Sequence, residues 1–181
     1  MTARAGEPFD ADRATSDIEA ALSAPVPAAG PTTSEGEPDT GEWTVTRGAG
    51  FLLLPLWESE ALTGVYGPEW NDAEAAAEAN LAALVAELDR RWGPHRTVSM
   101  RVPLHRSRTG APLPEPFRTL TAKDCHGDLT VWGPVPPDGP PTAPRAPRWL
   151  ALSLNQSDGD APMILTALIS ARPIEEPDER H

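Results

Sequence analysis

The only cysteine of the chain lies in a short polar stretch whose residue types could support catalysis. Residues 123–128, with the sequence KDCHGD, place Cys125 beside His126 and Asp128, and Lys123 is the only lysine of the protein. A cysteine acts as a nucleophile when its pKa is lowered and a base lies within hydrogen-bond distance. This combination of residues therefore raises the question of cysteine catalysis.

The spacing within this stretch argues against a local catalytic dyad. Cys125 and His126 are adjacent, and adjacent side chains of an extended chain point in opposite directions. Negative charge on Asp124 and Asp128 would raise the pKa of the thiol and disfavour the thiolate. The stretch favours the tip of a hairpin, with Gly127 supplying a positive φ.

A catalytic site at this position would need a base from another part of the chain. The candidates are His95 and His105, which flank a predicted strand. One interpretation of this stretch is therefore a turn with no catalytic role. The alternative is a small enzyme or ligand-binding domain that uses Cys125, His126 and Asp128 with one of these histidines.

Metal and cofactor motifs are absent from the sequence. The paired Cys and His spacings of zinc sites do not occur. Residues 155–160, NQSDGD, are similar to a calcium loop, but the glycine is misplaced and the bidentate glutamate is missing. This segment predicts a turn between two strands, and we expect neither a metal nor a cofactor.

Basic residues gather in one segment of an otherwise acidic protein, namely Arg96, Arg101, His105, Arg106 and Arg108. Such a cluster is either a solvated loop that folds against the protein's own acidic tail or a contact for an anion or an acidic protein. Arg101, Arg106 and Arg108 are candidate interaction residues on the second interpretation.

Tryptophan is abundant, with six residues in a chain of 181. Most should anchor the core, because an indole buries a large apolar area. Trp57, on a predicted edge strand, and Trp132, at the end of a predicted hairpin strand, are candidates for an exposed interface hot spot.

Charge and composition narrow the functional classes. The net charge is −12, but segment 43–173 carries only −2, so the acidity lies in the two ends. Acidic ends disfavour binding to nucleic acid and to anionic membranes. The lone cysteine, the absence of a long apolar run and the Arg-, Ala- and Pro-rich composition favour a bacterial protein of the cytoplasm.

Hydrophobic periodicity predicts an α+β domain over 43–173. A helix is expected over 72–92, with Asn71 as its cap and a buried stripe on one face. Strands are expected at 43–46, 51–57, 96–104, 117–122, 129–133, 148–156 and 162–171. The predicted architecture is a mainly antiparallel sheet of about five or six strands with the long helix on one face.

The ends of the chain are expected to lie outside this domain. Segment 1–42 is rich in small and acidic residues and is predicted to be disordered, apart from a transient helical turn capped by Ser16. Segment 174–181 is predicted to be an acidic tail. We therefore expect a non-catalytic domain, such as an immunity or antitoxin-like protein, adaptor or regulator, that binds a protein partner through a sheet face or edge.

Overall fold

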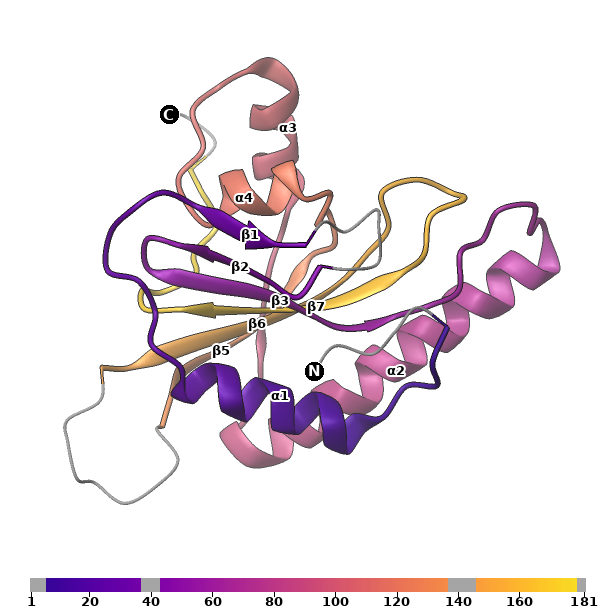
Figure 1. Cartoon of the computed structure of the whole chain (residues 1–181), viewed down its shortest axis with the longest axis horizontal. Coiled ribbons are helices and arrows are strands. Elements are labelled where there is room, and N and C mark those ends of the chain that lie inside the picture. Colours follow the sequence, from indigo (N-terminus) through magenta and orange to yellow (C-terminus); the bar gives the residue numbers. More distant parts are fainter. Residues whose placement is uncertain (1–5, 37–42, 137–145, 179–181) are drawn as a thin grey trace.

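The protein is a three-layer α+β structure. The computed structural model describes residues 6–36, 43–136 and 146–178, which form four helices and seven strands. Helices α1 and α2 lie on one face of the sheet, and α4 lies on the other with α3 beyond it (Figure 1). Segment 134–147, whose proline-rich sequence predicts an extended loop, falls largely in 137–145, outside the described residues.

The sheet is open and antiparallel throughout, with the order β1-β2-β3-β7-β6-β5-β4. Its strands are β1 (Thr33–Glu35), β2 (Val45–Gly48), β3 (Phe51–Glu58), β4 (Arg96–Val98), β5 (Leu129–Val135), β6 (Arg148–Asn155) and β7 (Ile164–Ser170). The antiparallel sheet is confirmed, but it has seven strands rather than five or six. The two edge strands have three residues each, too few to show an alternating pattern.

The central strands β6 and β7 are buried on both faces. Leu150 and Leu152 of β6 pack toward α1 and α2, whereas Ala151 packs toward α4. In β7, Ala167 and Leu168 divide between the two faces in the same way. Burial on both sides explains why these segments are apolar throughout, and both are strands as predicted.

The predicted long helix is present as α2 (Pro68–Trp92), but it begins four residues earlier than expected. Gly67 is its N-cap and Pro68 its first residue, a position where the missing proline N–H costs nothing. Asn71 is not the cap, because its N–H already donates to the Gly67 carbonyl inside the first turn. The helix ends at Gly93, whose φ is 85°.

The prediction of disorder over 1–42 is wrong for α1 (Ala11–Ser23). Asp10 caps this helix by accepting a hydrogen bond from Arg13 N–H at 3.0 Å, so Ser16 is not its cap. Ile18 is fully buried against the sheet. The helix belongs to the core because tertiary packing stabilises a short amphipathic element that is marginal alone.

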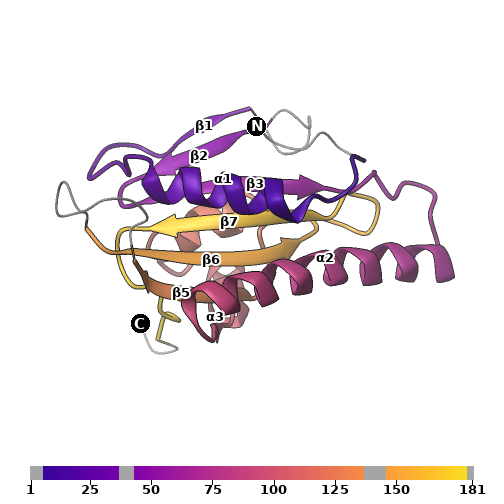
Figure 2. The ribbon, with the colours of Figure 1, turned by 90° about the horizontal axis from the view of Figure 1, so that it is seen from below.

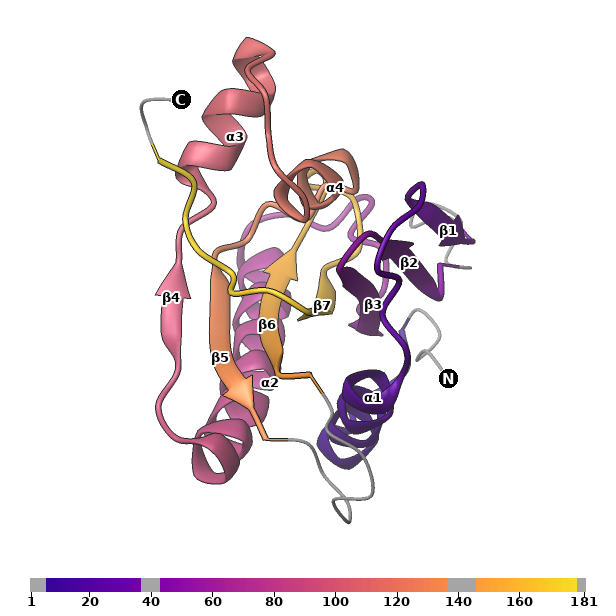
Figure 3. The same cartoon turned by 90° about the vertical axis from the view of Figure 1, so that its left-hand side faces the viewer.

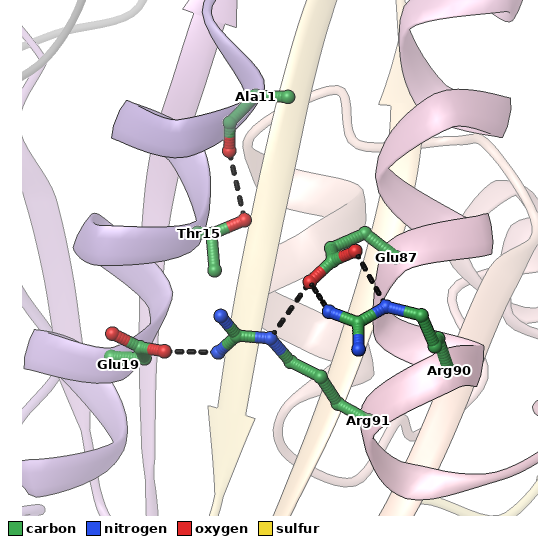
Figure 4. A network of polar contacts seen from close by, with 6 residues as sticks. All are labelled: Ala11, Thr15, Glu19, Glu87, Arg90 and Arg91. Atoms are coloured by element: carbon green, nitrogen blue, oxygen red, sulfur yellow. Dashed lines mark hydrogen bonds and ion pairs between the residues drawn. The ribbon is translucent and has the colours of Figure 1, made fainter.

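Helices α1 and α2 lie across the same face of the sheet (Figure 2). An ion pair between Arg91 and Glu19 connects them. Arg91 of α2 donates to Glu19 of α1 and, at 3.0 Å, to Glu87 of its own helix. Arg90 also donates to Glu87, at 2.6 Å (Figure 4). The hydrogen bonds from Arg90 and Arg91 lower the pKa of Glu87, so this carboxylate is charged at neutral pH.

Two predicted strands are wrong in whole or in part. Segment 96–104 is a strand only in β4, and it continues as α3 (Arg101–Thr109). Pro103 lies in the first turn of α3, where a helix tolerates proline. Segment 117–122 is α4 (Phe117–Ala122), whose Phe117 and Leu120 are three residues apart and buried under the sheet's second face.

A proline removes a hydrogen-bond donor from a strand, so Pro55 in segment 51–57 predicts either an edge strand or a bulge. Pro55 lies at a bulge of β3, and β3 is not an edge strand. The register against β7 shifts between Pro55 and Trp57. Strand β2 pairs with Phe51–Leu53 only. Pro55 therefore lies beyond the part of β3 that β2 pairs, where its missing N–H removes no bond to that neighbour.

The C-terminal segment packs against the domain instead of leaving it as a tail (Figure 3). Ile174 is 1% exposed and joins the core on the α4 side of the sheet. Arg96 donates to the Ile174 carbonyl, and Arg106 donates to the Asp178 carbonyl. Within the described residues, Arg96 and Arg106 of the basic segment thus meet the acidic end of the chain through two backbone carbonyls.

Replacing Ile18 tests whether α1 is part of the cooperative core. Ile18→Ala should lower the free energy of unfolding by about 2–5 kcal/mol, because it leaves a cavity under a fully buried side chain. Ser16→Ala, on the exposed face of the same helix, should change it by less than about 0.5 kcal/mol. Chemical denaturation measures both, and equal stabilities would show that α1 does not pack as described.

The C-terminal packing makes a similar prediction. Ile174→Ala should destabilise the fold by about 2–5 kcal/mol, whereas Glu175→Ala, which is exposed, should leave it nearly unchanged. Urea unfolding followed by tryptophan fluorescence measures the difference. Coincident transitions for Ile174→Ala and the parent protein would contradict the packing.

Candidate functional site

The KDCHGD stretch connects α4 to β5 and is not the tip of a hairpin. The last turn of α4 is closed by Cys125 N–H, which donates to the Leu120 carbonyl at 2.9 Å. Asp124 takes the left-handed conformation here, with φ at 54°, and is the only non-glycine residue with positive φ in the described part of the chain. Aspartate tolerates this conformation better than most residues.

Gly127 is required by close contact rather than by a positive φ. A Cβ at this position would lie 2.1 Å from the Leu154 carbonyl oxygen of β6. Its N–H donates to Asn155 Oδ1 at 2.9 Å. The glycine therefore lets the connection lie directly against β6, which corrects the expected role of this residue.

The thiol of Cys125 is buried and protonated. The residue is 2% exposed, and Sγ–H donates to the Lys123 carbonyl at 3.6 Å. Burial, and secondarily the charge of Asp124, raises the pKa of the thiol to about 12. A thiol in this state is a poor nucleophile at neutral pH.

The histidines predicted as possible bases lie elsewhere. His126 Nε2 is 3.6 Å from Asp124 Oδ1, and His105 is exposed on α3. His95 Nδ1 is 3.0 Å from Asp89 Oδ1 at the end of α2. Among the described residues, no histidine ring makes a hydrogen bond to Cys125 Sγ.

The sheet separates His95 from Cys125. The His95 ring packs on Trp132 with the ring centroids 5.7 Å apart, and Trp132 belongs to the core on the α1 and α2 side. Cys125 belongs to the core on the opposite side. Desolvation raises the pKa of Asp89, but hydrogen bonds from His95 and Trp132 outweigh it and hold that pKa below the usual value.

Asp128 has a structural contact rather than a place beside the thiol. Its Oδ1 accepts a hydrogen bond from Met100 N–H at 2.7 Å, and Met100 is the N-cap residue of α3. The carboxylate therefore fixes the start of β5 against the start of α3. The alternative catalytic set of Cys125, His126 and Asp128 with a distant histidine is not assembled.

The connection does, however, form one wall of a small hollow of about 120 Å³. We call this hollow the Cys125 pocket. Its other walls come from Trp43 and from the loop between β6 and β7. The lining residues are Trp43, Ala122, Lys123, Asp124, Cys125, Asn155, Gln156, Ser157, Ala161, Pro162 and Ile164.

A buried polar network holds the floor of the Cys125 pocket. Asn155 Nδ2 donates to Ser153 Oγ at 2.9 Å and to Thr166 Oγ1 at 3.0 Å. Its Oδ1 accepts from Gly127 N–H, so the amide joins β6, β7 and the connection. Sequence analysis assigned Asn155 to a turn and missed this role, because two of its partners, Thr166 and Gly127, are 11 and 28 residues away.

The two tryptophans predicted as interface residues are in the core. Trp57 is 8% exposed, and its Nε1–H donates to the Glu7 carbonyl at 2.8 Å. Trp132 is 2% exposed and donates to Asp89 Oδ1 at 3.0 Å. Neither indole ring is exposed enough to form an interface hot spot.

The basic candidates divide into two groups. Arg106 is 8% exposed and is occupied by the carbonyls of Pro112 and Asp178. Arg101 and Arg108 are exposed on α3. Only the second group lies on a surface that a partner can reach.

Comparisons with known proteins do not assign the chain to a family. No protein-family model matches the chain, and it has no significant match among curated proteins or solved structures. Within the described ranges, no group of three His, Cys, Asp or Glu residues is placed to hold a metal ion. No helix found there has both the length and the apolar character needed to cross a membrane.

The state of Cys125 can be tested by thiol labelling. At pH 8 the folded protein should react with a soluble disulfide reagent about a thousandfold more slowly than the unfolded chain, because its pKa rises from 9.0 to about 12. The measurement compares rates with and without denaturant. Comparable rates in both conditions would show an accessible, reactive thiol.

Proposed function

We propose that the protein is a non-catalytic domain of the cytoplasm that binds an acidic protein partner through the exposed face of α3. The supporting observation is the arrangement of charge on this helix. Arg101, His105 and Arg108 are four and three residues apart, a spacing that places them on one helix face. We call this surface the basic face.

The opposite face of α3 attaches the helix to the domain. Val102, Pro103 and Arg106 are its buried residues, and Arg106 holds the C-terminal segment. Asp178 therefore contacts α3 through Arg106, on the side of the helix that packs against the domain. The helix lies beyond α4, away from the sheet (Figure 3).

Charge complementarity indicates the chemistry of the partner. The chain carries −12 overall, and the basic face is a positive surface within it. Complementary potentials guide association and select against partners of the wrong charge. An acidic protein fits this surface, whereas the overall negative charge repels nucleic acid at longer range.

The state of the Cys125 loop supports binding rather than catalysis. The thiol is protonated and buried, and the candidate bases are paired elsewhere or exposed. Immunity proteins, antitoxins, adaptors and small regulators act by binding alone, and we place the protein in this general class.

The proposal predicts a partner that depends on the basic face. The tagged full-length chain, purified from the cells that encode it, should recover a specific acidic protein. Arg101→Glu with Arg108→Glu should reduce its recovery at least about tenfold, because two favourable charge contacts become repulsive. Raising the salt concentration should weaken binding of the purified pair, because it screens exposed charges.

A matched control separates this effect from a general change of charge. Arg90→Glu with Arg118→Glu reverses two side chains that are 71% and 68% exposed on other helices. This control should recover the partner normally. Equal recovery with the α3 variant, or a wild-type chain that recovers no specific protein, would refute the proposal.

A further inference from the structure

A second hollow, of about 280 Å³, lies between α2 and the sheet. Its apolar part comes from Leu81 of α2, Leu154 of β6 and Met163, which precedes β7. All three pack with the core on the α1 and α2 side, so the hollow lies on the face of the sheet opposite Cys125. We call this hollow the α2 groove.

Two carboxylates on α2 give the α2 groove its charge. Glu74 and Glu78 both line it, and their spacing of four residues places them on one side of the helix. Glu78 is exposed and Glu74 is half-buried. In the part of the chain that the structure describes, neither carboxylate has a hydrogen bond or an ion pair. Both are therefore available to a cation from outside the molecule.

The basic face of α3 begins close to the α2 groove. Asp128 also lines the groove, and its Oδ1 accepts a hydrogen bond from Met100 N–H at the N-cap of α3. Arg108 is exposed on the basic face and has no hydrogen bond or ion pair to another described residue. Helix α3 projects from the fold beyond α4, where a neighbouring molecule can reach it (Figure 3).

An arginine side chain matches the α2 groove in size and in chemistry. The volume of the groove equals roughly nine water molecules at ~30 Å³ each, and an arginine side chain has fewer non-hydrogen atoms than that. Its methylene stem can lie along Leu81 and Met163. Its planar guanidinium can then donate to the carboxylates of Glu74 and Glu78.

We propose that the acidic partner of the basic face is a second copy of this chain, with Arg108 of each molecule in the α2 groove of the other. This inference rests on the proposed function of the basic face and names its partner. Because each molecule carries both complementary surfaces, a two-fold axis forms the same contact twice. Repulsion between the two domains is small, because segment 43–173 carries only −2.

Sedimentation velocity of the full-length protein tests the association. At about 0.1 M salt the protein should dimerise at sub-millimolar concentration, and at about 1 M salt it should be monomeric, because salt screens exposed charges. Arg108→Glu and Glu78→Arg should each weaken dimerisation at least about tenfold, because each change replaces an attraction by a repulsion.

A mixture of these two variants separates a lost contact from a damaged fold. In the mixed dimer, one α2 groove keeps its native arginine and the other pairs the two reversed charges. An equimolar mixture should therefore dimerise although neither variant does so alone. Arg90→Glu, which changes a side chain that is 71% exposed at the other end of α2, is the control and should dimerise like the parent protein.

Three results would overturn the proposal: a parent protein that is monomeric at low salt, a single variant that dimerises as well as the parent, or a mixture that stays monomeric. The proposed function fails by a different result, namely equal recovery of a partner with and without Arg101 and Arg108. A monomeric protein that recovers another acidic protein through these arginines would refute the second copy as partner and support the proposed function.

Discussion

The fold depends on the burial of β6 and β7 on both faces. Neighbouring residues along β6, such as Leu150 and Ala151, enter different cores, so each face of the sheet must be covered. A single long helix cannot cover both faces of a seven-stranded sheet. This constraint explains why the chain uses its terminal segments as packing elements.

Both ends of the chain supply part of the cover. Ile18 of α1 completes the core beside α2, and Ile174 completes the core beside α4. Near Ile18, Glu19 of α1 pairs with Arg91 of α2 (Figure 4). Exposed pairs of this kind add little stability, so buried apolar side chains are the main reason that α1 and the segment around Ile174 pack on the sheet.

Sequence periodicity predicted the elements whose pattern is long and whose burial is simple. Helix α2 and strands β6 and β7 fall in this class. It failed where tertiary contacts decide between helix and strand: Met100 and Val102 continue the alternation of β4, yet Val102 already belongs to α3. It also failed for α1, because four buried residues in thirteen do not distinguish a packed helix from a polar segment.

The candidate site was predictable in position but not in chemistry. KDCHGD does line a pocket, because the short connection from α4 to β5 must pass over the end of the sheet. Gly127 of this stretch contacts Asn155 and Leu154, which lie 28 and 27 residues further along the chain. No local sequence pattern indicates these contacts. No local pattern indicates the pairing of His95 with Asp89 either. This pair holds the imidazole on the face of the sheet opposite Cys125.

The buried polar network under the Cys125 pocket joins the connection after α4 to the central strands of the sheet. Buried polar groups must be satisfied, and Ser153, Asn155 and Thr166 satisfy one another within the sheet. Catalysis by Cys125 would require a base or a cation beside the thiol, but burial and the neighbouring carboxylate favour its neutral form. The polar residues of this connection therefore hold α4 and β5 against β6 and β7, which is a structural role.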